Sequence, residues 1–251
     1  MKRFPFILLL IFSFSSIHAA ETVYKLNLKT EAALGIATIA LWSPSWIGHS
    51  ATGQQPAKLG INSLDRSYMY AYHATLDDYS TACAYFTLVM PGVTVLSRMK
   101  HFDVLTTYAM MYLEAFSLTF ATKDLLKSRV HRYRPHTYFD SGLNSGHDIT
   151  DSFPSGHTAF AFLGASFLAT TLMQDLPDAK WRIPAMAAGY TLATGVGIMR
   201  VKSGNHFITD AITGAAIGSF FGWVVPRLHL KSQTDFVIQP KQSGIMMCMR
   251  F

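Results

Sequence analysis

The stretch DSFPSGHTAFAF, residues 151–162, passes from a polar segment into an apolar run. Proline, serine, glycine and histidine stand at 154–157, directly before alanines and phenylalanines, an order typical of a helix start with Ser155 as its N-cap. The first backbone N–H groups of a helix have no acceptor within it and lie at the positive end of its dipole, so they attract anions. The stretch therefore predicts either a plain helix start or one that binds an anion.

The composition around this stretch favours apolar helices. Of the 251 residues, 50% are hydrophobic and 14% are charged, whereas about 25% are charged in an average soluble domain. The length suits one domain, and no linker rich in proline, serine or glycine divides the sequence. Apolar stretches rich in small residues predict helices at 32–42, 79–96, 104–122, 158–173, 184–199 and 207–225. We expect an all-α helical bundle.

The two ends of the chain differ from the predicted bundle. Residues 1–20 combine a basic start, an apolar run and a final pair of alanines, which is typical of an export signal peptide. His18 departs from the preferred cleavage pattern, so an uncleaved anchor is the alternative. Residues 231–251 are interpreted as a C-terminal tail. The expected domain thus covers residues 21–230.

Five of the six apolar stretches are expected to cross a membrane. The first, 32–42, is too short for a span, which needs about 20 residues. If the mature N-terminus lies outside, the other five place most lysines and arginines of the connecting segments on the inner side. The basic residues are otherwise scattered, and the formal net charge of +6 predicts no nucleic-acid partner.

Three polar segments interrupt the apolar pattern at helix ends, and the five-span topology places all of them on the outer face. They are KSRVHRYRP at 127–135, PSGH at 154–157 and RVKSGNHFITD at 200–210. Lys127, Arg134 and Arg200 supply cationic donors, and arginine can hold two oxygens at once. Ser155 adds a hydroxyl donor, and Gly156 lets a ligand approach the backbone closely. The set suits a tetrahedral oxyanion.

The third segment also carries a candidate nucleophile. His206 and Asp210 are four residues apart, so they share one helix face. A carboxylate there can accept a hydrogen bond from one imidazole nitrogen and leave the other nitrogen free to attack. His157, on a different helix, can protonate a leaving oxygen as general acid. The pattern predicts acid–base and nucleophilic chemistry at the bound anion.

Together the three segments resemble the signatures of the type 2 phosphatidic acid phosphatase (PAP2) superfamily, which shares its site with class A bacterial acid phosphatases and vanadium haloperoxidases. The matching patterns are K-x6-RP at 127–135, PSGH at 154–157 and R-x5-H-x3-D at 200–210. The resemblance implies an all-helical bundle and a phosphohistidine mechanism that needs neither a metal nor a cofactor. It implies that His206 is the nucleophile, Asp210 its partner and His157 the acid. The implied phosphate-binding residues are Lys127, Arg134, Ser155, Gly156 and Arg200.

One position departs from the family pattern. Met199 stands where the family usually has serine before the arginine of the third signature, so the hydrogen bond of that serine is not expected. The charged and nucleophilic positions are all present. We therefore expect a phosphatase acting on a phosphate monoester or diphosphate of a lipid, located in the inner membrane of a bacterial envelope with its site facing the periplasm.

Three alternative functions remain open on the sequence. They are a soluble periplasmic acid phosphatase of broad specificity, a vanadium-dependent haloperoxidase and a membrane protein that binds a lipid phosphate without hydrolysing it. The sequence identifies neither the lipid nor the oligomeric state. No metal site is predicted, because His131, His136, His147, Asp148 and Asp151 are irregularly spaced among arginines that would repel a cation.

Two further charged residues have more than one interpretation. Arg132 is interpreted as a solvated charge in preference to an additional phosphate ligand. Glu114 lies within an apolar stretch, where an ionisable group faces the bundle interior or a polar cavity. A hydrogen bond between helices is favoured there over a functional role.

Overall fold

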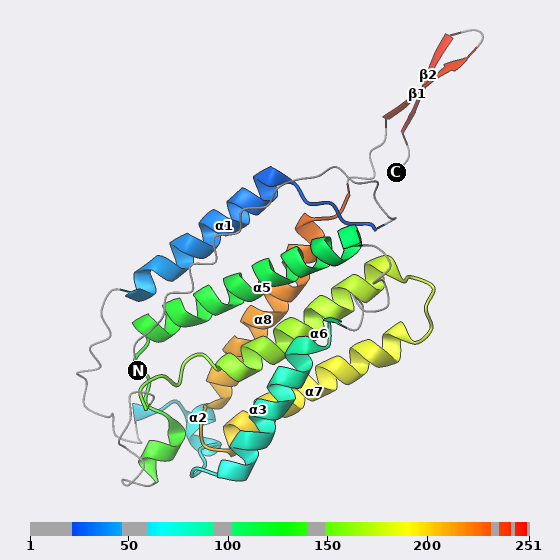
Figure 1. Ribbon diagram of the computed structural model, residues 1–251. Coiled ribbons are helices and arrows are strands. Elements are labelled where there is room, and N and C mark those ends of the chain that lie inside the picture. The colour runs from blue at the N-terminus through cyan, green and yellow to red at the C-terminus, as the bar shows by residue number, and fades with distance from the viewer. Residues whose placement is uncertain are drawn as a thin grey trace.

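The computed structural model describes residues 22–46, 60–92, 102–139, 149–231, 236–241 and 244–249, and these contain six long helices. The long helices are α1 (Leu28–Trp42), α3 (Ala74–Val89), α5 (Phe102–Arg129), α6 (Gly156–Asp175), α7 (Arg182–Lys202) and α8 (Ile208–Leu228). Shorter elements are α2 (Ser63–Ser67) and the 3-10 helices η1 (Ser43–Trp46) and η3 (Pro135–Tyr138). Figure 1 shows the arrangement. The predicted export signal at 1–20 lies outside the described residues.

Each of the six predicted helical stretches overlaps a long helix, so the helical bundle is confirmed, while residues 93–96 of the stretch predicted at 79–96 lie outside the described residues. The boundaries differ mainly at polar ends, where capping residues extend a helix beyond its apolar run. Helix α5 continues to Arg129, which places Lys127 in its last turn. Helix α3 starts at Ala74, after His73 caps it, and ends at Val89.

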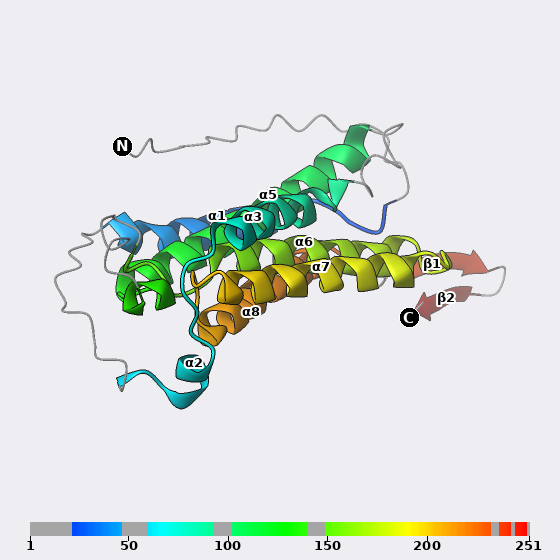
Figure 2. The ribbon, with the colours of Figure 1, turned by 90° about the horizontal axis from the view of Figure 1, so that it is seen from below.

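The C-terminal segment contains a hairpin where a tail was expected. Strands β1 (Phe236–Lys241) and β2 (Gly244–Met249) pair antiparallel, with Phe236 opposite Met249. Figure 2 shows this hairpin beyond the end of the bundle that is opposite α2. Two short strands leave too little alternation in the sequence to be recognised by pattern.

Helix α6 is the central element of the bundle. It packs against α3, α5, α7 and α8, and Figure 1 shows it between α5 and α7. Most of its residues are buried, and many are alanine, glycine, serine or threonine. Small side chains on all sides of a helix allow its neighbours to approach closely. This packing holds the first residue of α6, Gly156, in a defined place at one end of the bundle.

The outer faces of the bundle expose many large apolar side chains. On α3 they include Tyr85 and Phe86, and on α8 they include Phe220 and Trp223. Two described helices are long and apolar enough to cross a membrane, α6 with 20 residues and a mean hydropathy of 1.2, and α8 with 21 residues and 1.4. Helix α6 meets this criterion although most of it is buried inside the bundle, so composition alone does not make it a span.

Helices α6 and α8 approach so closely that one glycine has no room for a side chain. A Cβ atom on Gly218 would lie 2.0 Å from the carbonyl oxygen of Ala159. We predict that Gly218→Ala lowers the free energy of unfolding by about 1–3 kcal/mol, because the helices must move apart. Thermal unfolding in detergent measures this effect. Gly195→Ala is the matched control, since a Cβ there meets nothing within 4 Å. Equal stability of the two variants would contradict the close packing.

Candidate active site

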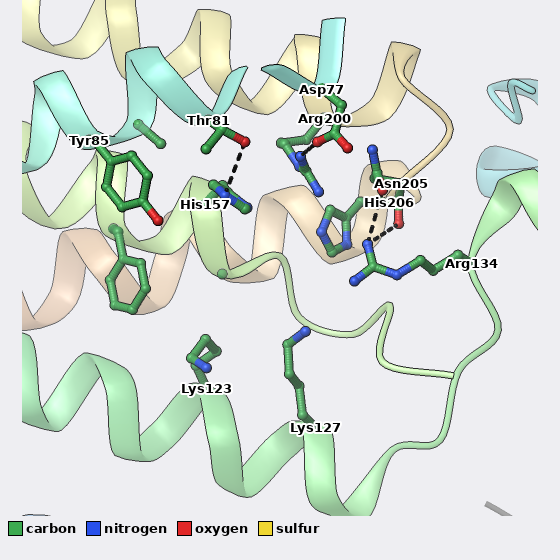
Figure 3. A pocket seen from close by; sticks show the side chains of 13 residues that line it. Asp77, Thr81, Tyr85, Lys123, Lys127, Arg134, His157, Arg200, Asn205 and His206 are labelled. Atoms are coloured by element: carbon green, nitrogen blue, oxygen red, sulfur yellow. Dashed lines mark hydrogen bonds and ion pairs between the residues drawn. The ribbon is translucent and has the colours of Figure 1, made fainter. Parts of the chain in front are cut away.

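The three polar segments meet at a single cavity of about 490 Å³. Figure 3 shows side chains from α3, α5, α6 and α7 and from the turn before α8 around it. Six of the eight site residues expected from the sequence line this cavity: Lys127, Arg134, Gly156, His157, Arg200 and His206. The other two, Ser155 and Asp210, are fully buried and are not among the lining residues. The cavity has the size of a small-molecule site.

The cationic residues reach the cavity from different elements. The Lys127 ammonium, at the end of α5, donates to the carbonyl oxygen of Asp151 at 2.7 Å. Arg134 is buried and donates through Nη1 to the backbone oxygen of Asn205 at 3.2 Å. The Arg200 guanidinium donates through Nη1 to Asp77, while its buried Nε has no acceptor among the described residues. These groups concentrate positive charge in a poorly solvated place, which favours an anion.

The start of α6 forms another wall of the cavity. Gly156 is its first residue, and a Cβ atom there would lie 3.0 Å from the Lys123 side chain, so glycine allows the close approach. Ser155 occupies the N-cap position, but its hydroxyl interacts with the Thr158 hydroxyl at 2.9 Å and its N–H donates to the Asp210 carbonyl oxygen. The N–H of Ser155 is thus engaged inside the fold, and phosphate binding by its hydroxyl stays a prediction.

His206 is held in one orientation by the backbone. Its Nδ1 lies 2.7 Å from the carbonyl oxygen of Ser152, which can only accept, so Nδ1 carries the proton and Nε2 keeps its lone pair. The ring is 2% exposed and lines the cavity. Burial, together with the positive charges of Arg134 and Arg200, holds the pKa of His206 well below its usual range. The ring is therefore neutral at pH 7, which is the form that can attack an electrophile.

The direct hydrogen bond expected between Asp210 and His206 needs correction. Asp210 Oδ2 lies 3.8 Å from His206 Nδ1, which is too far for a hydrogen bond. The carboxylate instead accepts from the Phe207 backbone N–H at 2.8 Å, the Ser152 hydroxyl at 2.5 Å and Arg132. The first turn of α8 folds the carboxylate back onto its own backbone, and Ser152 connects it to His206. Ser152 thus contacts both Asp210 and His206.

Arg132 is neither a solvated charge nor a residue lining the cavity, so both interpretations from the sequence are corrected. Its guanidinium bridges two fully buried carboxylates, Asp65 at 2.6 Å and Asp210, and stacks on the Phe207 ring. Asp65 also accepts from the Thr209 backbone N–H at 3.0 Å. Burial alone would raise the pKa of Asp65. Hydrogen bonds from Thr209 and Arg132 outweigh this effect and hold the pKa below its usual range. Helix α2 is thereby fastened to the start of α8, directly behind His206.

Sequence reasoning missed several residues that line the cavity. Asp77, Thr81 and Tyr85 lie one turn apart on α3, and the Thr81 hydroxyl is 3.3 Å from His157 Nε2. Lys123 stands one turn before Lys127 on α5. The spacing of four residues placed each set on one helix face, but only the packing of α3 and α5 around α6 brought those faces to the motifs.

Of the residues considered for a metal, buried His136 contacts the Gly204 carbonyl oxygen through Nδ1, and His147 and Asp148 lie outside the described residues.

Comparison with known proteins places these residues in a family. The family model described as PAP2 superfamily matches residues 108–234. A lipid A 1-phosphatase from Rhizobium johnstonii is 36% identical over 122 residues, which are 47% of this chain and 46% of the relative. Phosphatidylglycerophosphatase B from Bacillus subtilis is 26% identical over 140 residues, 55% of this chain and 66% of the relative. The chain spans about half the length of the two Rhizobium lipid A 1-phosphatases that it matches.

A solved structure supports the same fold. The crystal structure of a transmembrane PAP2 type phosphatidylglycerolphosphate phosphatase from Bacillus subtilis aligns with a TM-score of 0.50 and 22% identity. The alignment covers 80% of this chain and 96% of that one. The likeness extends beyond the three segments to the helices that carry them.

The pairing of Arg200 with Asp77 generates a prediction about anion binding. Asp77 lines the cavity and its negative charge opposes that of an incoming anion. We expect Asp77→Asn to tighten the binding of inorganic phosphate by about tenfold, because the carboxylate no longer competes for Arg200. Titration calorimetry on the purified protein measures the dissociation constants.

The adjacent acid provides the control for this experiment. Asp78 is exposed and is not among the residues lining the cavity, so Asp78→Asn removes the same charge without opening Arg200. Its phosphate affinity should stay close to that of the unmodified chain. Equal phosphate affinity of the two variants would show that Asp77 does not compete with phosphate for Arg200.

Proposed function

The chain belongs to the PAP2 superfamily. From this membership and the geometry of the cavity, we propose that it is a phosphatase that releases phosphate from a phosphorylated lipid. The reaction proceeds through a phosphohistidine intermediate. The observation that carries the proposal is the neutral His206 ring facing the same cavity as Lys127, Arg134 and Arg200. A binder of phosphate needs the cations but has no use for a nucleophile held in one tautomer.

Binding places the phosphate group among the cations and the start of α6. Lys127, Arg134 and Arg200 contact its non-bridging oxygens, and the unpartnered Nε–H of Arg200 is one donor for them. These groups also stabilise the negative charge that spreads over the same oxygens in the transition state of phosphoryl transfer. The cations therefore serve both binding and catalysis.

Reaction then proceeds in two displacements. His206 Nε2 attacks phosphorus in line, the nitrogen–phosphorus bond forms, and the bond from phosphorus to the lipid oxygen breaks. His157, which takes up a proton once the phosphate dianion is bound beside it, gives that proton to the departing oxygen. In the second step His157 takes a proton from water, whose oxygen displaces the imidazole and releases inorganic phosphate. Besides water, the two steps use His206, His157 and the cations that line the cavity.

The Ser152 carbonyl oxygen and the Asp210 carboxylate stabilise the His206 ring when it becomes positively charged during the reaction. Attack through Nε2 leaves a positive charge on the phosphorylated imidazole. The Ser152 carbonyl oxygen at 2.7 Å and the Asp210 carboxylate at 3.8 Å both stabilise that charge. A distance of 3.8 Å is too long for a hydrogen bond, but it is short enough for the Asp210 carboxylate to form an ion pair with the charged imidazole.

A lipid is the substrate that best fits the surroundings of the cavity. Tyr85 and Phe160 line it beside the polar groups, and Tyr85 and Phe86 expose more than half of their area on α3. The matched relatives named above act on lipid A or on a phosphatidylglycerophosphate by their names. We infer that α6 and α8, which begin at the cavity, run into the membrane, with about five spans in all and the site on the periplasmic side after an export signal. This placement keeps the acyl chains in the bilayer and the phosphate at its surface.

The nucleophile is tested by removing it. We predict that His206→Ala lowers the rate of phosphate release by at least about a thousandfold, since the proposed covalent intermediate forms on this ring. The measurement is inorganic phosphate release by the detergent-solubilised protein from a panel of lipid phosphates, in a chelator and without added metal. Retained binding of inorganic phosphate by the variant shows that its cavity is intact. Substantial turnover by His206→Ala would exclude the mechanism.

The role of His157 is tested through the leaving group. A lipid alkoxide is strongly basic and needs a proton, whereas p-nitrophenolate leaves without one. We expect His157→Gln to lower the turnover of the lipid substrate by about 10²–10⁴-fold and that of p-nitrophenyl phosphate far less. Equal losses on both substrates would show that His157 does not act as the acid. In the unmodified chain, preference for the small ester would instead favour a soluble-type acid phosphatase.

A further inference from the structure

A second cluster of ionisable side chains lies away from the phosphate cavity. It consists of Glu31 in the first turn of α1, Glu114 in the middle of α5 and His229 just after α8. One ligand atom from each of the three lies within 4.8 Å of the others. Helix α8 has 21 residues and starts beside His206, so at 1.5 Å per residue the two sites are about 30 Å apart. Figure 1 shows the helices α1, α5 and α8 that carry the cluster.

The histidine of this cluster is oriented as metal-binding histidines are. His229 Nδ1 lies 2.8 Å from the carbonyl oxygen of Val225, an acceptor, so Nδ1 carries the proton. The other ring nitrogen, Nε2, then faces Glu31 Oε1 at 3.0 Å and Glu114 Oε2 at 3.3 Å, and it is the atom left to bind a metal ion. A second ring nitrogen that donates to a backbone carbonyl is the usual support for a histidine ligand.

Two carboxylate oxygens of this cluster have no hydrogen-bond donor among the described residues. Glu31 Oε2 and Glu114 Oε2 are buried and have no hydrogen-bond partner among the described residues. Glu114 is 9% exposed as a residue and His229 is 1% exposed, so water has little access. Three ligand atoms thus converge on one buried point, and a cation or shared protons must offset the repulsion between the two carboxylates.

We propose that Glu31, Glu114 and His229 bind one divalent transition-metal ion, with zinc the ion that fits the donors best. A neutral imidazole and two carboxylates give a total charge of −2, which one divalent ion neutralises in this buried place. One nitrogen and two oxygens are typical zinc ligands, and water completes the four-coordinate shell. Magnesium prefers an all-oxygen shell of several waters.

The spacing of the donor atoms agrees with a tetrahedral ion. Two ligands that are each about 2.0 Å from a tetrahedral zinc ion lie about 3.3 Å apart. His229 Nε2 lies 3.0 Å from Glu31 Oε1 and 3.3 Å from Glu114 Oε2. The side chains therefore need little movement to coordinate the ion.

The ion would stabilise the fold without taking part in phosphate release. Helix α1 packs on α5 and has no fully buried residue, so apolar burial holds it weakly. Coordination would join the first turn of α1 to α5 and to the end of α8. This role is separate from the proposed phosphatase chemistry, so either proposal can fail alone.

The test is the zinc content and thermal stability of the full chain, purified in detergent without a polyhistidine tag. After loading with zinc and dialysis, we expect about one zinc ion per chain by elemental mass spectrometry. Glu114→Gln and His229→Gln should lose that zinc. A strong chelator should lower the unfolding temperature of the unmodified chain and leave that of each variant unchanged. The exposed acid Asp178 supplies the control, because Asp178→Asn should retain zinc.

The unmodified chain alone can overturn the proposal, whether or not the variants fold. If it retains no zinc after dialysis and its unfolding temperature responds neither to zinc nor to the chelator, shared protons hold the three side chains together. Zinc that remains bound to Glu114→Gln and His229→Gln would likewise place the ion elsewhere. Phosphate release at 25 °C should persist in the chelator, which separates this outcome from a failure of the catalytic mechanism.

Discussion

The buried carboxylate of Asp210 is the constraint on which the site depends. A charge with no exposed surface must have partners inside the protein. It obtains them from Arg132 of the first motif, from Ser152 just before the second and from the Phe207 backbone in the third. The Asp210 carbonyl oxygen also accepts from the Ser155 N–H, which fixes the start of α6. One residue therefore sets the positions of all three motifs relative to one another.

The electrostatics of the cavity follow from that arrangement. Lys127, Arg134 and Arg200 gather positive charge around His206, and burial together with these charges lowers the pKa of the ring and keeps it neutral. Two carboxylates offset part of the positive charge near the site. Asp77 pairs with Arg200, and Asp65 pairs with Arg132. The cations that line the cavity attract an anion, while Arg132 behind it connects two buried carboxylates. A single network produces an anion site and a nucleophile together.

The sequence predicted what is encoded locally. The six helices follow from apolar runs and their caps, and six expected site residues line the cavity because each motif sits at a helix end. Predictions that depended on a particular hydrogen bond were less successful. The hydrogen bond between Asp210 and His206 was expected from their spacing of four residues, which allows such a contact without requiring it. In the structure the Asp210 carboxylate accepts from the Phe207 backbone N–H instead. Arg132 could not be assigned, since Asp65 lies 67 residues away in the chain.

The sequence by itself therefore determined the helical class, the family signatures and the residue types that can hold and attack a phosphate. Those features are short in range, because helix propensity, capping and motif spacing act over a few residues. The tertiary structure alone decided which nitrogen of His206 is free, which carboxylates pair with which arginines, and that Glu31, Glu114 and His229 meet. Each of these depends on packing distant segments around α6, where small side chains allow close approach and burial makes every polar group find a partner.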